Sequence, residues 1–385
     1  MTDASPVWFR EHLLEELLPL WLRHAPSDSG LFRCRFDADW KASPDLSGTL
    51  TSQSRLIYNF SVGLRLTGEK RYEQALRAGA GFLLERFADP DEGGWHFSVD
   101  PRGRAVEEAK DSYGHAFMVF ALAHAALATG DEGYAEQARE VWELIRTRFS
   151  DGRGGIWQRM SRDFVPRDEH KSQNPIMHLF EALLALAAVP GHQEALRDAE
   201  DVAGFVLRRL LRVDGSLPEF YDQDWRELPA DRRGRIDIGH QFEWAFLLSR
   251  AAELGLDRNL LEPSRQLLAT GMKLGFDAEA GGIFNAAAPD GSLLVGRKGW
   301  WQQCEAIRAL MHHSIVRCRE DLREPLRKSL EFFRTRFHDA VKGGWFPAPE
   351  GARHKGGPHK VDYHVVAMCE EALRLDRPSS GQADG

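Results

Sequence analysis

A long, regular repeat runs through this 385-residue chain. Its clearest marker is a pair of glycines that follows a phenylalanine and precedes an aromatic residue or an isoleucine. The first glycines of the four pairs are Gly93, Gly154, Gly281 and Gly343. The first and last steps between them are nearly equal, whereas the middle step spans two units, and Asp214-Gly215-Ser216-Leu217 occupies the place of the missing pair. Such a period indicates stacked supersecondary units.

Polar residues follow the same period. They recur at almost equal intervals, once in each repeat, as Arg55, His115, His178, His240, Gln302 and His364. If the repeats close into a ring, one polar side chain from each repeat is expected to point into the centre.

Each repeat contains two helical segments of different character. Residues 114–122 are apolar on almost every side, as in a helix buried all round, whereas residues 134–149 carry a polar stripe and are expected outside. Six inner helices are predicted to begin near residues 51, 112, 174, 238, 300 and 362. A helix over residues 6–24 supplies the sixth outer member, so that the ring closes where the two ends of the chain meet.

The predicted fold is therefore all-α, an (α/α)6 barrel of six helix-pair repeats with short β-turn loops at one mouth. An open solenoid would fit the period too, but it would not need both ends of the chain to complete one unit. We expect a single catalytic domain over residues 1–376 and a flexible tail over 377–385, because no linker or change of composition divides the chain.

Composition restricts the partners. The formal net charge is −8, without a basic block, so neither a nucleic acid nor an anionic membrane is an expected partner. The four cysteines lack CxxC spacing, and the N-terminal segment lacks the basic residues followed by an apolar run that are typical of a signal peptide. Both observations favour a reducing cytoplasm. Dinucleotide-binding and P-loop motifs are absent, so no cofactor is expected. The chain is expected to be a monomer or a homodimer.

The polar residues of the inner helices indicate chemistry. They lie in the first turns of these helices and should gather at one mouth, beside loops rich in aromatic residues that suit sugar rings. Glu243 follows His240 by three positions, as Glu181 follows His178, so each carboxylate can orient an imidazole. Arg55 would be costly in an apolar helix unless it meets a ligand oxygen or a carboxylate.

Neutral imidazole is a suitable base for proton abstraction beside a carbonyl. A second imidazole on the opposite face would give epimerisation, whereas one imidazole moving the proton between adjacent carbons would give aldose–ketose isomerisation. Both pass through a cis-enediol, whose oxyanion Arg55 would stabilise. The predicted catalytic residues are His240, His364, Arg55, His178 and Glu243. The predicted substrate-binding residues are Tyr58, Asn59, Tyr113, His115, Asn174, Glu181, Trp301, Gln302 and Glu305, with no metal ligand.

The motifs that contain these residues resemble the N-acylglucosamine 2-epimerase superfamily over essentially the whole chain. They are Ser54-Arg55 with Tyr58, residues 174–182 (NPIMHLFEA), residues 240–244 (HQFEW), residues 298–305 (KGWWQQCE) and Asp362-Tyr363-His364. The resemblance implies an acid/base pair of His240 and His364 at the substrate's C2. It also implies that His178 and Glu243 assist ring opening and orient the bases, that Arg55 polarises the C1–C2 oxygens, and that no metal or nicotinamide is used.

Among the reactions of this superfamily, we expect the isomerisation of free mannose to fructose first. A 2-epimerase of mannose and glucose, or of β-1,4-linked disaccharides such as cellobiose, is the alternative. A glycoside hydrolase on the same barrel is the main rival of another class. It would use two carboxylates from Asp111, Glu181, Glu243, Glu305 and Asp362, but the histidines are surplus to that chemistry. A non-catalytic sugar- or partner-binding ring ranks third.

Overall fold

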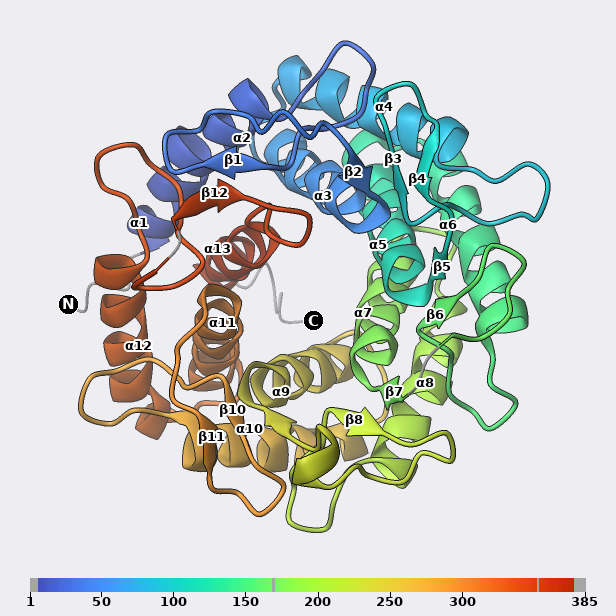
Figure 1. The fold of residues 1–385 in the computed structure, drawn as a ribbon. Helices are drawn as coiled ribbons and strands as arrows, with labels where there is room; N and C mark the ends of the chain where they lie inside the picture. The colour runs from blue at the N-terminus through green and yellow to red at the C-terminus, as the bar shows by residue number, and fades with distance from the viewer. Residues whose placement is uncertain (1–5, 168–169, 352, 377–385) are drawn as a thin grey trace, which may run out of the picture.

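The computed structural model describes residues 6–167, 170–351 and 353–376. Six inner helices form a ring, and further helices surround them (Figure 1). The inner helices are α3 (Leu50–Thr67), α5 (Ser112–Thr129), α7 (Asn174–Ala187), α9 (Ile238–Glu253), α11 (Trp300–Val316) and α13 (Tyr363–Asp376). The predicted (α/α)6 barrel is confirmed, and each inner helix begins at its predicted start or at the adjacent position. The predicted tail, 377–385, lies outside the described residues.

The outer helices connect consecutive inner ones. They are α4 (Lys70–Arg86), α6 (Glu132–Leu144) with its continuation η2 (Ile145–Phe149), α8 (Ala195–Arg209), α10 (Leu261–Gly275) and α12 (Arg323–Arg336). The sixth outer member is the N-terminal segment, α1 (Pro6–Glu11), η1 (His12–Leu17) and α2 (Leu18–His24). Short 3-10 turns η3 (Ala230–Arg232), η4 (Arg258–Leu260) and η5 (Glu320–Leu322) occur in the connections.

The two ends of the chain close the ring, as predicted. Helix α1 packs against α13, and the indole nitrogen of Trp21 donates a 3.0 Å hydrogen bond to Asp362. Strand β1 (Phe36–Asp37) pairs antiparallel with β12 (His354–Gly356), so the first and last loops are joined as well (Figure 1). An open solenoid is excluded by these contacts.

Inner helices are more buried than outer ones, because inner helices are apolar on almost every side whereas outer helices carry a polar stripe. Helix α5 is composed almost wholly of small and apolar residues and is buried on nearly every face. Helix α8 buries only its small apolar stripe, Ala195, Ala199, Ala203 and Val206. Gly130 ends α5 with a positive φ, in the left-handed conformation that favours glycine.

Short antiparallel strands gather at the mouth where the inner helices begin (Figure 1). The pairs and triplets are β2 (Gly48–Thr49) with β3 (Ser98–Val99) and β4 (Ala105–Glu107), β5 (Lys110–Asp111) with β6 (Arg159–Met160), β7 (Lys171–Ser172) with β8 (Phe220–Tyr221), and β9 (Ile236–Asp237) with β10 (Ala286–Ala287) and β11 (Leu293–Val295). Each group joins two successive repeats, which fixes the loops over the first turns of the inner helices.

In each of five loops, one residue that precedes an inner helix is hydrogen-bonded through its backbone to the start of the inner helix of the preceding repeat. Its backbone carbonyl accepts a hydrogen bond from the amide that begins, or just precedes, that helix. The five donor–acceptor pairs are Leu50 to Phe97, Ser112 to Gln158, Gln173 to Glu219, Ile238 to Asn285 and Trp300 to Pro347. A side chain at this position is therefore held beside the start of an inner helix.

Lysine–aspartate pairs fasten the same loops. Lys110 lies 2.8 Å from Asp89, Lys298 lies 2.7 Å from Asp277, and Lys355 lies 2.7 Å from Asp339. Lys171 pairs with Asp151 in the same way. Each lysine stands shortly before an inner helix, and each aspartate follows an outer one, so the pair recurs with the repeat.

In the described ranges, no helix is long and apolar enough to cross a membrane.

Candidate active site

His240, in the first turn of α9, is held by a glutamate from the loop before β8. Its Nδ1 lies 2.6 Å from Oε2 of Glu219. Glu219 occupies the loop position that lies beside the start of an inner helix, and it also accepts hydrogen bonds from Ser172 and Gln173. A carboxylate that accepts from Nδ1–H fixes the tautomer and leaves Nε2 free for proton transfer.

His364, in the first turn of α13, has the same arrangement. Its Nδ1 lies 2.7 Å from Oε1 of Glu305, a fully buried residue of α11. The indole of Trp301 contacts both imidazoles, with ring centroids 4.8 Å from His240 and 5.7 Å from His364. Gly239 permits this approach, because a Cβ there would lie 2.5 Å from the Trp301 ring. Two imidazoles with fixed tautomers therefore flank one aromatic platform.

The surroundings shift the two imidazole pKa values in opposite directions. Burial acts to lower the pKa of His240, but the negative charges of Glu219 and Asp237 outweigh it and raise the pKa above 6.5. Burial and the positive charges of Arg55 and His178 lower the pKa of His364 well below 6.5. At neutral pH, His240 is therefore suited to donate a proton and His364 to accept one.

His178, on α7, forms a third imidazole–carboxylate pair. Its Nδ1 lies 3.3 Å from Oε2 of Glu181, which also accepts a hydrogen bond from the hydroxyl of Tyr363. Burial acts to raise the pKa of Glu181, but the hydrogen bond from His178 and the charge of Arg308 hold it at about 2. The predicted pairing of His178 with Glu181 is thus present in the structure.

Glu243 lies among these pairs without a partner of its own. It is fully buried, neither carboxyl oxygen has a hydrogen-bond partner among the described residues, and Oε1 lies 3.9 Å from His178 Nδ1. Burial and the charges of Glu305 and Glu181 raise the pKa of Glu243 well above 4.5. The raised pKa favours the neutral form of Glu243, which can donate a hydrogen bond, and Glu219, not Glu243, holds His240.

Arg55, on α3, brings a positive charge to the same cluster. Its Nη1 donates to the carbonyl of His359 at 2.6 Å, and its Nη2 donates to the hydroxyl of Tyr113 at 2.7 Å. The guanidinium packs over the ring of Phe117 at 4.2 Å. Neither of these two oxygen acceptors is a carboxylate, and Nε of Arg55 has no hydrogen-bond partner among the described residues. Its charge is thus available to a substrate oxygen.

His115 does not join the cluster, although it follows the same period. Its Nε2 accepts from the amide of Trp95 at 3.2 Å, and its Nδ1 lies 2.7 Å from the carbonyl of Asp111. Three glutamines at the same place in their inner helices, the fourth residue, accept from the corresponding loop amides, namely Gln53, Gln241 and Gln303. His115 is therefore a structural clamp between helix and loop.

Two other predicted residues also point elsewhere. The hydroxyl of Tyr58 donates to Glu370 at 2.6 Å, toward the other end of the barrel. Asn59 is fully buried and donates to the carbonyl of Val361 at 2.8 Å. Both connect α3 to the segment around α13.

Asn174 and Gln302 lie in the first turns of α7 and α11. Each has a buried side-chain oxygen without a hydrogen-bond partner among the described residues. Both oxygens can accept a hydrogen bond from a ligand hydroxyl, so these two positions remain compatible with substrate binding.

Several described carboxylates and imidazoles are close enough to hold a cation. His178, Glu181 and Glu243 form one such group, and Glu243, Glu305 and His364 form another, each with ligand atoms within 4.8 Å of one another. Both groups depend on Glu243, which the burial favours in its neutral form.

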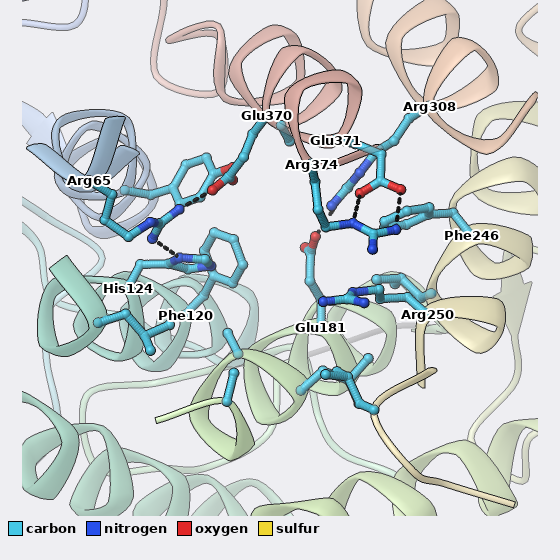
Figure 2. A pocket seen from close by; sticks show the side chains of 18 of the residues that line it. Arg65, Phe120, His124, Glu181, Phe246, Arg250, Arg308, Glu370, Glu371 and Arg374 are labelled. Atoms are coloured by element: carbon cyan, nitrogen blue, oxygen red, sulfur yellow. Dashed lines mark hydrogen bonds and ion pairs between the residues drawn. The ribbon is translucent and has the colours of Figure 1, made fainter. Parts of the chain in front are cut away.

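A cavity of about 470 Å³ lies at the other end of the barrel, where the inner helices finish (Figure 2). Its arginines are matched by carboxylates: Arg65 pairs with Glu370, and Arg374 lies 2.7 Å from Glu371. The cavity reaches Glu181, but the imidazoles of His178, His240 and His364 lie near the starts of their inner helices, so the mouth where these helices begin is the candidate active site.

Known proteins resemble this chain in sequence and in fold. The model of the N-acylglucosamine 2-epimerase family matches residues 30–368. A cellobiose 2-epimerase of Bacteroides fragilis is 25% identical over 94% of this chain and 97% of its own length. A D-mannose isomerase of Marinomonas mediterranea is 24% identical over 95% and 96%. The crystal structure of a D-mannose isomerase superposes with a TM-score of 0.90 at 23% identity, over 97% of this chain and 98% of the other.

The hydrolase alternative matches at a greater distance. An α-mannanase of glycoside hydrolase family 76 from Bacteroides thetaiotaomicron shares the barrel with a TM-score of 0.67, at 12% identity and over 95% of each chain. This likeness concerns the fold alone. The family match covers most of the sequence and contains all three imidazole–carboxylate pairs. The chain therefore belongs to the N-acylglucosamine 2-epimerase family and is a sugar isomerase or epimerase.

Proposed function

We propose that the protein moves a proton at C2 of a free aldose through a cis-enediol intermediate, with mannose–fructose isomerisation as the leading reaction. The observation that carries the proposal is the pair His240 and His364, each with Nδ1 held by its own carboxylate and both packed on Trp301. The similarity to a D-mannose isomerase supports the choice of mannose.

The proposed chemistry assigns one role to each group. Nε2 of His364, the less basic imidazole, removes the C2 proton, and the electron pair forms the C1–C2 double bond while charge develops on the C1 oxygen. Arg55 stabilises this oxyanion. The protonated His364 then delivers this proton to C1, while the proton of the O2 hydroxyl passes to the C1 oxygen; the C1–C2 double bond becomes a single bond and the C2 carbonyl of the ketose forms. Glu243, as a neutral acid, and His178 assist opening of the sugar ring.

Epimerisation at C2 is the second candidate, because the same two imidazoles can also perform it. His240, whose pKa is raised, can return a proton to C2 on the face opposite His364. Mannose and glucose, or a β-1,4-linked disaccharide such as cellobiose, would then interconvert with a 2-epimer. The similarity to a cellobiose 2-epimerase over 94% of the chain supports this reading.

Product analysis with a set of sugars tests the proposal. The purified protein is incubated separately with mannose, glucose, fructose and cellobiose, and the products are separated by chromatography. Fructose from mannose supports the leading reaction, whereas glucose or a 2-epimerised disaccharide supports the second. Release of a reducing end from an aryl glycoside, with all four sugars unchanged, would contradict both.

The pH dependence of the rate provides a further prediction. Since Glu219 raises the pKa of His240, Glu219→Gln removes this effect and lowers that pKa. The acid form of His240 is then lost at lower pH, so the alkaline limb of the pH–rate profile for epimerisation should move down by about one unit. Glu227→Gln, in the same loop but paired with Arg212 near the surface, should leave the limb in place. An unmoved limb in Glu219→Gln would contradict the assignment of His240 as the acid.

We also propose a cytoplasmic location and a monomeric or homodimeric state, without a nucleic-acid or membrane partner. All four cysteines are free, and Cys34, Cys304 and Cys369 are buried, which suits a reducing compartment. Light scattering on the purified protein measures the oligomeric state, and a mass above that of a dimer would contradict this part.

A further inference from the structure

Arg308 connects two of the three imidazole–carboxylate pairs. It projects from α11, and its Nη1 lies 3.3 Å from Oε1 of Glu181 and 3.5 Å from Oε2 of Glu305. The guanidinium packs over the ring of Phe246 at 3.9 Å, and only 11% of the side chain is exposed. One buried cation is thus shared by two buried carboxylates.

The opposite oxygens of these carboxylates face the imidazoles. Glu305 holds Nδ1 of His364 at 2.7 Å, and Glu181 holds Nδ1 of His178 at 3.3 Å. Arg308 therefore touches no imidazole itself, but it contacts both groups that orient them.

Arg308 projects from the middle of α11 and also lines the cavity at the far end of the barrel. Figure 2 shows Arg308 and Glu181 at the cavity where the inner helices finish, with Arg374 close to Arg308 and Arg65 across the cavity. The other two arginines are paired with carboxylates of α13 and α9: Arg65 with Glu370, and Arg374 with Glu371 and Glu253. Among these three, Arg308 is the one whose carboxylate partners belong to the active site.

We propose that Arg308 is a positioning residue that keeps Glu305 and Glu181 ionised, so that His364 and His178 retain the tautomer with the proton on Nδ1. This inference rests on the proposed function, in which Nε2 of His364 is the base. A protonated Glu305 would donate to Nδ1 instead, which would place the imidazole proton on Nε2 and remove the base.

The electrostatics of Glu305 show why a cation is needed. Burial raises the pKa of Glu305, and the charge of Arg308 offsets part of the effect, leaving the pKa at about 7. Without Arg308 the carboxyl would be neutral over more of the working pH range. The rate requires the ionised form, so activity is present above this pKa and is lost as the pH falls through it.

The test compares Arg308→Met with Arg308→Lys. In Arg308→Met, the acidic limb of the pH–rate profile should move up by about one unit or more, and kcat at neutral pH should fall about ten-fold or more. Arg308→Lys, which keeps the charge, should return the limb toward its original position. Arg374→Met is the matched control, because Arg374 is an ion-paired arginine of the same cavity that contacts neither Glu181 nor Glu305. It should leave the limb unmoved.

A second readout does not require turnover. Nitrogen-15 NMR of histidine-labelled protein distinguishes the two tautomers of His364, identified by the signal missing in His364→Gln. At about pH 8, above the pKa of Glu305, the wild type should show mainly Nδ1–H, and Arg308→Met should shift the population toward Nε2–H at the same pH. A lower rate in Arg308→Met with an unmoved limb and an unchanged tautomer would overturn the proposal. If the wild type is inactive on all four sugars while the tautomer shift occurs, the proposed function fails and the role of Arg308 stands.

Discussion

Replacing His364 by alanine is expected to lower the rate of sugar interconversion by about 10²–10⁴-fold, the usual contribution of a general base. Its neutral imidazole is held by Glu305 with Nε2 free, and burial and the charges of Arg55 and His178 lower its pKa well below 6.5, so it is suited to accept the C2 proton. His240→Ala should cause a loss of similar size in epimerisation. Both are measured by steady-state kinetics, with circular dichroism to show unchanged helix content.

His115 provides the matched control for these variants. It is a buried histidine on the same sequence period, but both ring nitrogens are hydrogen-bonded to the scaffold. His115→Gln introduces the residue found at the same place in α3, α9 and α11, so a near-normal rate is expected. If His364→Ala keeps a near-normal rate, or if His115→Gln is as inactive as His364→Ala, the two-imidazole mechanism is wrong.

Removing the charge of Arg55 is the change with the next largest expected effect. Arg55→Ala should reduce kcat by about 10²–10³-fold, as for the loss of one donor to a developing oxyanion. Arg265→Ala, an exposed arginine paired with Glu262, should change the rate little.

A stability measurement separates catalysis from packing in Arg55→Ala. The variant leaves the carbonyl of His359 and the hydroxyl of Tyr113 without their donor, at a cost of about 1–3 kcal/mol in the free energy of unfolding. Urea denaturation measures this cost. If Arg55→Ala and Arg265→Ala lose equally little rate while only Arg55→Ala is destabilised, Arg55 has a structural role alone.

The barrel could be predicted because its signals are local and repeated. Each signal depends on a few neighbouring residues: the Gly-Gly turns, the uniformly apolar inner helices and the amphipathic outer ones. Because the signals recur, a degenerate repeat can be recognised by comparison with the others. The need for a sixth outer helix then indicated the N-terminal segment, which the contact of α1 with α13 confirms.

The direction of individual side chains was harder to predict, because the polar residues are in phase along the sequence but not within their helices. Arg55 is the sixth residue of α3, His115 the fourth of α5 and His364 the second of α13. One residue rotates a side chain by about 100° around a helix, so equal spacing does not give equal direction. His115 consequently shares its direction with Gln53, Gln241 and Gln303 rather than with His364.

The sequence also did not predict which residues from distant parts of the chain would contact one another. The i, i+3 rule predicted that Glu243 would face His240, yet the carboxylate that holds this imidazole is Glu219, from the preceding loop. The repeat does contain a signal for Glu219, since aligned loops place Phe97, Gln158, Asn285 and Pro347 at its position. No sequence pattern indicated the contact of Arg308 with Glu181, because this contact depends on how α11 faces α7 across the ring.

Deuterium incorporation tests the central claim, proton transfer at C2, most directly. Chelator-treated protein is incubated with mannose in D2O, and proton NMR follows the C2 signal of mannose and the C1 signals of fructose. The account predicts deuterium at these carbons as fructose or glucose forms, and the loss of exchange in His364→Ala. Product that forms without any deuterium incorporation, or exchange that persists in His364→Ala, would contradict it.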